Sequence, residues 1–167
     1  MKGKAEYIYN NLGKFIHTFN EIELFINLII AHHIEPKDRK FFLEYILNTS
    51  VIGFGSKIKI LINLNIFNKS QIKKIRDYSS NRNVFAHSNI NDSVDIEETS
   101  PNKITINVTD VILKTNSDGK VTEVNYNTFI KDHVSLQNEI IDFISEYIIT
   151  NNIDTHYNHI ENLNSLK

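Results

Sequence analysis

Residues 12–30 read LGKFIHTFNEIELFINLII. Apolar side chains recur in this run at intervals of three and four residues, which is the spacing of one face of an α-helix. The repeating positions are Leu12, Phe15, Ile16, Phe19, Ile22, Phe25, Ile26 and Ile29. The pattern predicts one long helix over about residues 4–33, ended by Pro36 because proline cannot continue a helix. Its length and apolar content indicate that it lies at the centre of the fold.

Three further helices are expected before residue 90. One covers about residues 37–48, and a second follows the break at Gly53-Phe54-Gly55. A third begins at Ser70, a residue type that favours the N-cap position, and runs to about Ser88. Short connections between these segments favour helices that pack as neighbours.

The pattern changes after residue 100. Ile104, Ile106 and Val108 alternate with polar residues, which is the period of a strand. Residues 116–119, NSDG, are a turn signal, and residues 121–126 read as the returning strand. We therefore expect a β-hairpin over about residues 103–126.

A last helix is expected over about residues 128–149, which again carry apolar side chains at helical spacing. The predicted fold is mainly α: an up-and-down bundle of about five helices, with the β-hairpin inserted between the fourth and the last helix. No linker divides the chain, so residues 1–150 are expected to form one domain. Residues 151–167 are expected to form a polar C-terminal tail.

The composition excludes several classes of site. The 167 residues include no cysteine, which excludes thiol catalysis, zinc-thiolate sites and disulfides. The N-terminus lacks the apolar core of a signal peptide, and the most apolar run, residues 22–34, is too short to cross a bilayer. We expect a cytoplasmic protein that does not associate with a membrane and binds no metal or other cofactor.

Charge is distributed unevenly, although the formal net charge is only −2. The segment between Ser56 and His87 contains one carboxylate, Asp77, and seven cationic side chains: Lys57, Lys59, Lys69, Lys73, Lys74, Arg76 and Arg82. Such a run is either a solvated helix face or a surface for a phosphate backbone. Lys73 and Lys74 are the candidates for RNA binding under the second interpretation.

The strongest chemical signal is the string Arg82-Asn83-Val84-Phe85-Ala86-His87. An arginine binds phosphate through a planar fork of donors, and a histidine titrates near neutral pH. These two groups can cleave RNA without a metal. We therefore take Arg82, His87 and Asn83 as the candidate catalytic residues.

A helical wheel divides this segment into two stripes. The first stripe is mostly apolar and holds Arg82; its members are Ile75, Tyr78, Arg82 and Phe85. The second is polar and holds His87; its members are Arg76, Ser80, Asn83 and His87, so that Arg76 and Ser80 are supporting candidates. Asn83 and His87 are four residues apart and can meet, which would fix the tautomer of the histidine.

An arginine on an apolar stripe needs a partner or a ligand. Glu23 lies inside the apolar run of the first helix, where a charge is costly unless it is paired. We expect an ion pair between Glu23 and Arg82, with Glu21 as the competing carboxylate. Such a pair would be a structural link between two helices, or a support for a catalytic arginine.

The chain resembles the HEPN superfamily, a group of small helical domains with an R-x4–6-H motif late in the bundle. The matching residues are Arg82 and His87, with Asn83 at the position where that family favours a polar residue. The Arg-Asn-x-Phe-Ala-His form and the Gly53–Ile58 segment are similar to bacterial HEPN proteins of the mannitol-repressor type. The resemblance covers about residues 5–150 in helix order.

The resemblance implies a homodimer in which two motif helices face each other and form one RNase site. His87 would act as general base on the ribose 2′-OH or as acid on the leaving 5′-oxygen. Arg82 would bind the scissile phosphate, and Asn83 would orient one of the two. The products would be a 2′,3′-cyclic phosphate and a 5′-hydroxyl. The expected function is a metal-independent endoribonuclease in a toxin–antitoxin or phage-defence system.

One position departs from the toxin-type members of that family. Some of them carry a tyrosine two residues after the motif histidine, where a partner nucleotidyltransferase modifies it, and this chain has Asn89. Regulation by that route is not supported, although an antitoxin or other regulatory protein remains a candidate partner. The alternative function is a non-catalytic HEPN-type dimer that binds a protein or a nucleic acid.

Overall fold

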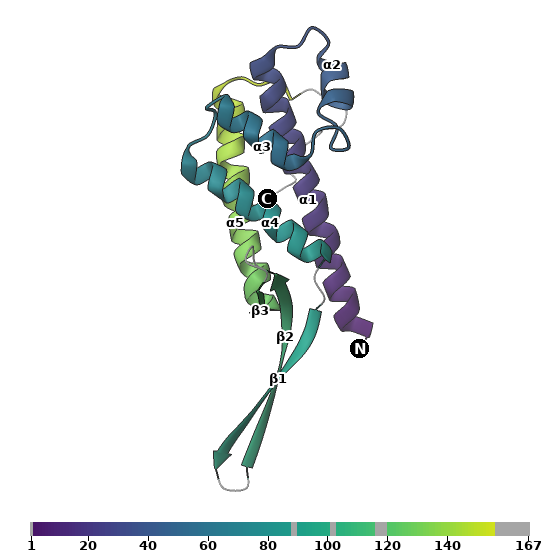
Figure 1. The fold of residues 1–167 in the computed structure, drawn as a ribbon, viewed down its shortest axis with the longest axis vertical. Helices are drawn as coiled ribbons and strands as arrows, with labels where there is room; N and C mark the ends of the chain where they lie inside the picture. Colours follow the sequence, from purple (N-terminus) through teal and green to yellow (C-terminus); the bar gives the residue numbers. More distant parts are fainter. Residues whose placement is uncertain (1, 88–89, 101–102, 116–119, 156–167) are drawn as a thin grey trace.

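The computed structural model describes residues 2–87, 90–100, 103–115 and 120–155. It is mainly helical and carries a small antiparallel sheet, as the sequence predicts. Figure 1 shows the helices gathered at one end of the molecule and a two-stranded arm that extends away from them.

Helix α1, Lys2–Ile34, runs through the centre of the bundle. Its second half is surrounded by other elements, so that nearly every apolar residue from Ile22 to Ala31 is buried. The helix ends at Ile34, where Glu35 takes a left-handed conformation (φ 48°) and Pro36 follows. A left-handed residue followed by proline is a usual way to end a helix.

The helix predicted over residues 37–48 is shorter than expected, and its second part is a π-helical turn, which is wider than an α-helix. It consists of α2, Arg39–Phe41, and the π-helical turn η1, Phe42–Ile46. Asp38 caps it by accepting a hydrogen bond from the Phe41 amide (2.8 Å). The chain then turns back at Asn48, whose carbonyl accepts from the amides of Val51 and Ile52, so the helix cannot extend further.

Helices α3, Phe54–Asn63, and α4, Lys69–His87, form an antiparallel pair beside α1. The start of α4 corrects the predicted cap at Ser70. Asn68 Oδ1 accepts from the Gln71 amide, and Gln71 Oε1 accepts from the Asn68 amide, both at 3.0 Å. This reciprocal pair is a capping box, and it satisfies two amide donors, which a lone serine cap would not do.

Helix α5, Tyr126–Thr150, runs in the same direction as α1, and α3 and α4 cross the two obliquely (Figure 1). The arrangement therefore differs from the simple up-and-down bundle that the sequence suggests. The packed part also extends past residue 150: Ile153 is buried, and Asp154 accepts a hydrogen bond from Arg39 (3.0 Å). The remainder of the predicted tail, residues 156–167, lies outside the described residues.

The sheet has three antiparallel strands in the order β1-β2-β3. The predicted hairpin is present as β2, Lys103–Thr115, paired with β3, Val121–Asn125. The prediction was incomplete, because β1, Ile90–Ser100, pairs with β2 from Ile90 to Ser100, with one irregularity between Glu98 and Ser100. At the base of the sheet, Ile112 packs with Tyr126 and Phe129 of α5 in a second small core.

Within the described part of the chain, no helix is both long and apolar enough to cross a membrane.

Candidate functional site on helix α4

The two predicted stripes of α4 are confirmed. Ile75 and Tyr78 are fully buried, while Arg82 and Phe85 at the end of the same stripe are half-buried. Arg76, Ser80 and Asn83 on the second stripe are exposed. His87 is the last residue of α4, and its side chain lies outside the described part of the structure. The helix therefore presents Arg82 at the boundary between core and surface.

Arg82 is held by two neighbours. Its guanidinium carbon lies 5.3 Å from the centroid of the Phe19 ring, which is a cation–π contact. One guanidinium nitrogen donates to Asn83 Oδ1 at 3.2 Å. Asn83 is thus a hydrogen-bond partner of the arginine. An aromatic surface and one amide oxygen leave most of the guanidinium donors unused.

The predicted Glu23–Arg82 pair is wrong. Glu23 Oε1 accepts from Lys57 Nζ at 2.5 Å and from Thr49 Oγ1 at 2.6 Å. Lys57 lies on α3, nearer to Glu23 than Arg82 is, and its side chain is completely buried against α1. The competing carboxylate, Glu21, binds His17 of its own helix at 3.3 Å.

Arg82 consequently has no carboxylate partner among the described residues. Its positive charge is not cancelled locally, and its free donors have the geometry that suits a phosphate. The basic segment also loses Lys57, because a fully buried cation bound to Glu23 cannot face RNA. The apolar neighbours of Lys57 in the sequence, Phe54, Ile58 and Leu61, could have shown that it lies on a core-facing stripe.

A cluster of aromatic side chains packs α4 against α1 and α5. The ring of His133 on α5 stacks on Tyr78 (4.6 Å, 12° between planes) and meets Phe15 and Phe85 edge to face. Both nitrogens of His133 are buried without a hydrogen-bond partner. Burial lowers its pKa to about 4, so the ring is neutral at pH 7. The sequence interpretation missed this residue, although His133 falls on the apolar stripe of α5 with Phe129 and Ile140.

Tyr78 connects the same cluster to polar groups. Its hydroxyl and Gln137 Oε1 are 3.3 Å apart, so the hydroxyl donates a hydrogen bond across to α5. Burial and the nearby Glu21 carboxylate raise the pKa of Tyr78, so the phenol stays protonated. Neither Tyr78 nor His133 has the free, exposed polar group that acid–base chemistry requires. Their contact instead holds α4 against α5.

The two lysines proposed for RNA binding are partly neutralised. Lys73 forms an ion pair with Asp77 one turn along α4 (2.6 Å), and Lys74 pairs with Glu139 of α5 (2.5 Å). Exposed pairs of this kind are weak and can rearrange when a stronger anion is present. Arg76 is exposed and has no ion-pair partner within the described residues.

The described residues contain no group of three or more His, Cys, Asp or Glu side chains that could hold a metal ion. No protein-family model, curated protein or solved structure matches this chain. The residues on α4 and their geometry are therefore the basis for assigning a function.

Proposed function

We propose that this chain is a HEPN-type endoribonuclease. It would cleave RNA in the cytoplasm by attack of the ribose 2′-OH on the adjacent phosphate. Arg82 binds the phosphate and stabilises the charge that develops in the transition state. His87 transfers the proton, and Asn83 holds the guanidinium in position. No metal ion is needed for these steps, and the natural setting is a toxin–antitoxin or phage-defence system.

One observation carries the proposal. Arg82 is half-buried on Phe19, oriented by Asn83, and free of any carboxylate among the described residues. A half-buried arginine is normally neutralised by an acidic partner, because an uncompensated charge is costly. An external anion would fill that role. The phosphate of RNA is the anion that a neighbouring histidine can act on.

The helical geometry favours a site that is shared between two copies of the chain. Residues five apart on a helix diverge by about 140°, so Arg82 and His87 of one copy point in different directions. A two-fold dimer with facing α4 helices would bring Arg82 of one copy toward His87 of the other. The exposed Arg76, Ser80 and Asn83 would then lie at or beside the shared site.

Purified protein, incubated with end-labelled RNA in the presence of EDTA, tests this proposal. Wild-type protein should cleave and leave 2′,3′-cyclic phosphate ends. The His87→Ala variant should lose cleavage, and Arg82→Lys should lose most of it, because lysine keeps the charge without the planar fork. Full activity of His87→Ala would contradict the mechanism, as would loss of wild-type activity on addition of EDTA.

A matched control is available on α1. His17 is exposed and pairs with Glu21 of its own helix, so His17→Ala removes a surface histidine that does not belong to α4. This variant should cleave like the wild type. Size-exclusion chromatography and thermal unfolding of each variant separate a lost catalytic group from a lost dimer or a lost fold.

A second candidate is a non-catalytic HEPN-type dimer that binds a regulatory protein or a nucleic acid. The ion pairs of Lys73 and Lys74 favour it, because they reduce the positive surface available to RNA. Under this function His87→Ala would not change partner binding, and a folded wild-type dimer would cleave no RNA.

A further inference from the structure

The arm formed by β1 and β2 has an open edge. Strand β1 pairs with β2 on one side, and the sheet order β1-β2-β3 leaves its other side without a strand among the described residues. Figure 1 shows the far half of the arm extending away from the helices, so no described helix lies along that part of the edge. Every second residue of an edge strand directs its backbone N–H and C=O groups outward, where an added strand can bind them.

Within the described residues, only the base of the arm has a third strand. Strand β3 pairs with β2 over residues 111–115, and the rest of the arm is a two-stranded ribbon. In this ribbon the cross-strand partners Val94 and Val108 are both more than half exposed. Ile96 and Ile106 pair two residues further along the strands and therefore belong to the same face. A two-stranded ribbon is only marginally stable in water, and a further strand beside β1 would stabilise it.

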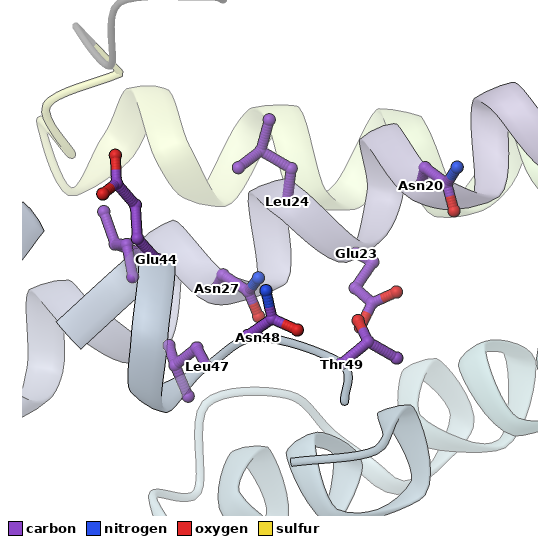
Figure 2. A pocket seen from close by; sticks show the side chains of 9 residues that line it. Asn20, Glu23, Leu24, Asn27, Glu44, Leu47, Asn48 and Thr49 are labelled. Carbon is purple, nitrogen blue, oxygen red and sulfur yellow. The ribbon is translucent and has the colours of Figure 1, made fainter. Parts of the chain in front are cut away.

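The arm carries an excess of acidic residues. Residues 90–110 contain five carboxylates and one lysine, which are Asp92, Asp95, Glu97, Glu98, Asp110 and Lys103. In the bundle, by contrast, cations of the same chain balance several carboxylates. Glu23, which Figure 2 shows directed toward Thr49, binds Lys57 of α3, and Glu139 is likewise bound by a lysine of α4. One lysine cannot balance the charge of the arm, so its charge favours a cationic partner.

This charge disfavours two other classes of partner. A nucleic acid would be repelled, because its phosphate backbone binds to cations. A second copy of β1 would also be repelled, because the strand contains four carboxylates and no lysine or arginine. In any register of a β1–β1 pair the facing charges would have the same sign, which destabilises a sheet. The basic segment of a second copy is helix α4, whose backbone groups are bonded within the helix and cannot extend a sheet.

We propose that the outer edge of β1 binds an extended, cationic segment of a partner protein, which adds to the sheet as a further strand. Residues 94–97 read Val-Asp-Ile-Glu, so apolar and acidic residues take turns over this stretch. Residues that face each other across two strands lie on the same face of the sheet. The complementary segment therefore alternates Val or Ile with Lys or Arg. Backbone hydrogen bonds provide the affinity, and the alternating side chains fix the register.

A synthetic peptide tests this proposal on the full-length chain. The probe is a capped peptide of about nine residues, a usual strand length, in which lysine alternates with valine and isoleucine. When it is titrated into isotope-labelled protein, NMR should show shifted amide signals in β1, and every second amide of β1 should exchange more slowly with solvent. A second peptide, N-methylated at two adjacent central residues, keeps every side chain but loses the N–H group that faces β1. It should bind at least about tenfold more weakly. Equal binding of the two peptides would overturn strand addition, because only unspecific charge attraction would remain.

Charge reversal on the protein tests the assignment from the other side. The double variant Asp95→Lys with Glu97→Lys should bind the lysine peptide at least about tenfold more weakly, and it should bind a peptide with glutamate in place of each lysine. The matched control, Asp132→Lys with Asp142→Lys, makes the same change of net charge at exposed positions of α5 and should bind the lysine peptide like the wild type. Equal losses in the two double variants would show that only the net charge matters, and would refute the site on β1.

The other partners have outcomes of their own in the same NMR experiment. Shifts of the β1 amides on addition of RNA, or on raising the protein concentration alone, would assign the edge to RNA or to a second copy and would overturn the proposal. Neither result depends on cleavage. A protein that cleaves RNA but ignores the peptide keeps its proposed function and loses this surface, whereas one that binds the peptide but never cleaves keeps the surface and loses the RNase.

Discussion

Lys57 Nζ lies 2.5 Å from Glu23 Oε1, and this ion pair joins α3 to the centre of α1 inside the core. Thr49 Oγ1 donates to the same oxygen at 2.6 Å and links the pair to the loop after η1. Desolvation of two charges offsets much of their attraction, so the pair is not in itself a large source of stability. However, substitution of only one partner would leave the other as a buried charge without a counter-charge.

Single substitutions of this pair should be strongly destabilising. Lys57→Met and Glu23→Leu each leave one buried charge unpaired, and each should lower the free energy of unfolding by about 3–5 kcal/mol. The double variant should recover most of that loss, because no charge remains. Urea denaturation of the four proteins measures the coupling. Additive losses in the double variant would contradict the pairing seen here.

The same design distinguishes Lys57 from Arg82 as the partner of Glu23. Glu23→Leu combined with Arg82→Met should show no recovery, since the two side chains do not form an ion pair. A recovery of several kcal/mol in this combination would instead support the ion pair between Glu23 and Arg82 that the sequence predicted.

His133 should make the stability of the protein depend on pH. Its pKa is lowered from 6.5 to about 4 in the folded state, so the unfolded chain binds the extra proton between these values. The free energy of unfolding should therefore fall as the pH drops from about 6.5 to about 4, by about 3 kcal/mol in total. Above pH 6.5 the ring is neutral in both states and contributes no pH dependence.

The variant His133→Phe isolates this effect from the titration of carboxylates. Phenylalanine fits among Phe15, Tyr78 and Phe85 and has no nitrogen to protonate. The difference in unfolding free energy between the variant and the wild type should grow in favour of the variant as the pH falls to about 4. His17→Phe, at an exposed position, should show no such trend, and a parallel pH profile for His133→Phe would refute the burial of a neutral ring.

The parts of the fold that the sequence predicts well are those with strong periodicity. The long first helix follows from its run of Phe and Ile, and the stripes of α4 follow from a helical wheel. The ion-pair partner of Glu23 could not be predicted, because the choice between Lys57 and Arg82 depends on how α3 crosses α1. A helical wheel gives the direction of a side chain on its own helix and contains nothing about the neighbouring one.

Strand β1 escaped prediction for a different reason. Its residues are polar and acidic at several positions, including Asp95, Glu97 and Glu98, and they lack the clear alternation that a buried face imposes. The strand forms through pairing with β2, from Ile90↔Ile112 to Ser100↔Lys103. Pairing of this kind leaves little trace in the sequence, because backbone hydrogen bonds between strands do not depend on the side chains.

Mixed dimers should reveal whether the RNase site is shared between copies. Arg82→Ala and His87→Ala should each be inactive alone, and unfolding and refolding them together should yield about half mixed dimers. A mixed dimer holds one intact Arg82 and one intact His87 on opposite copies. Cleavage should therefore reappear in the mixture. Continued inactivity, with exchange verified by a size tag, would place both residues of a working site on one copy.

The distal arm of the sheet should be dispensable for folding. Val94 and Val108 are cross-strand partners, yet they remain 54% and 61% exposed, so this part of the arm buries almost nothing against the bundle. The base of the arm differs, because Ile112 is buried and packs with Tyr126 and Phe129.

Replacing residues 94–108 by an Asn-Gly turn between Ser93 and Thr109 keeps the base and removes the rest. The melting temperature should stay within about 3 °C of the wild type, because a change of this size corresponds to roughly 1 kcal/mol in a chain of this length. Differential scanning calorimetry measures it. A much larger drop would mean that the arm supports the bundle through contacts beyond its base. An unchanged melting temperature with altered RNA cleavage would assign the arm to the handling of substrate.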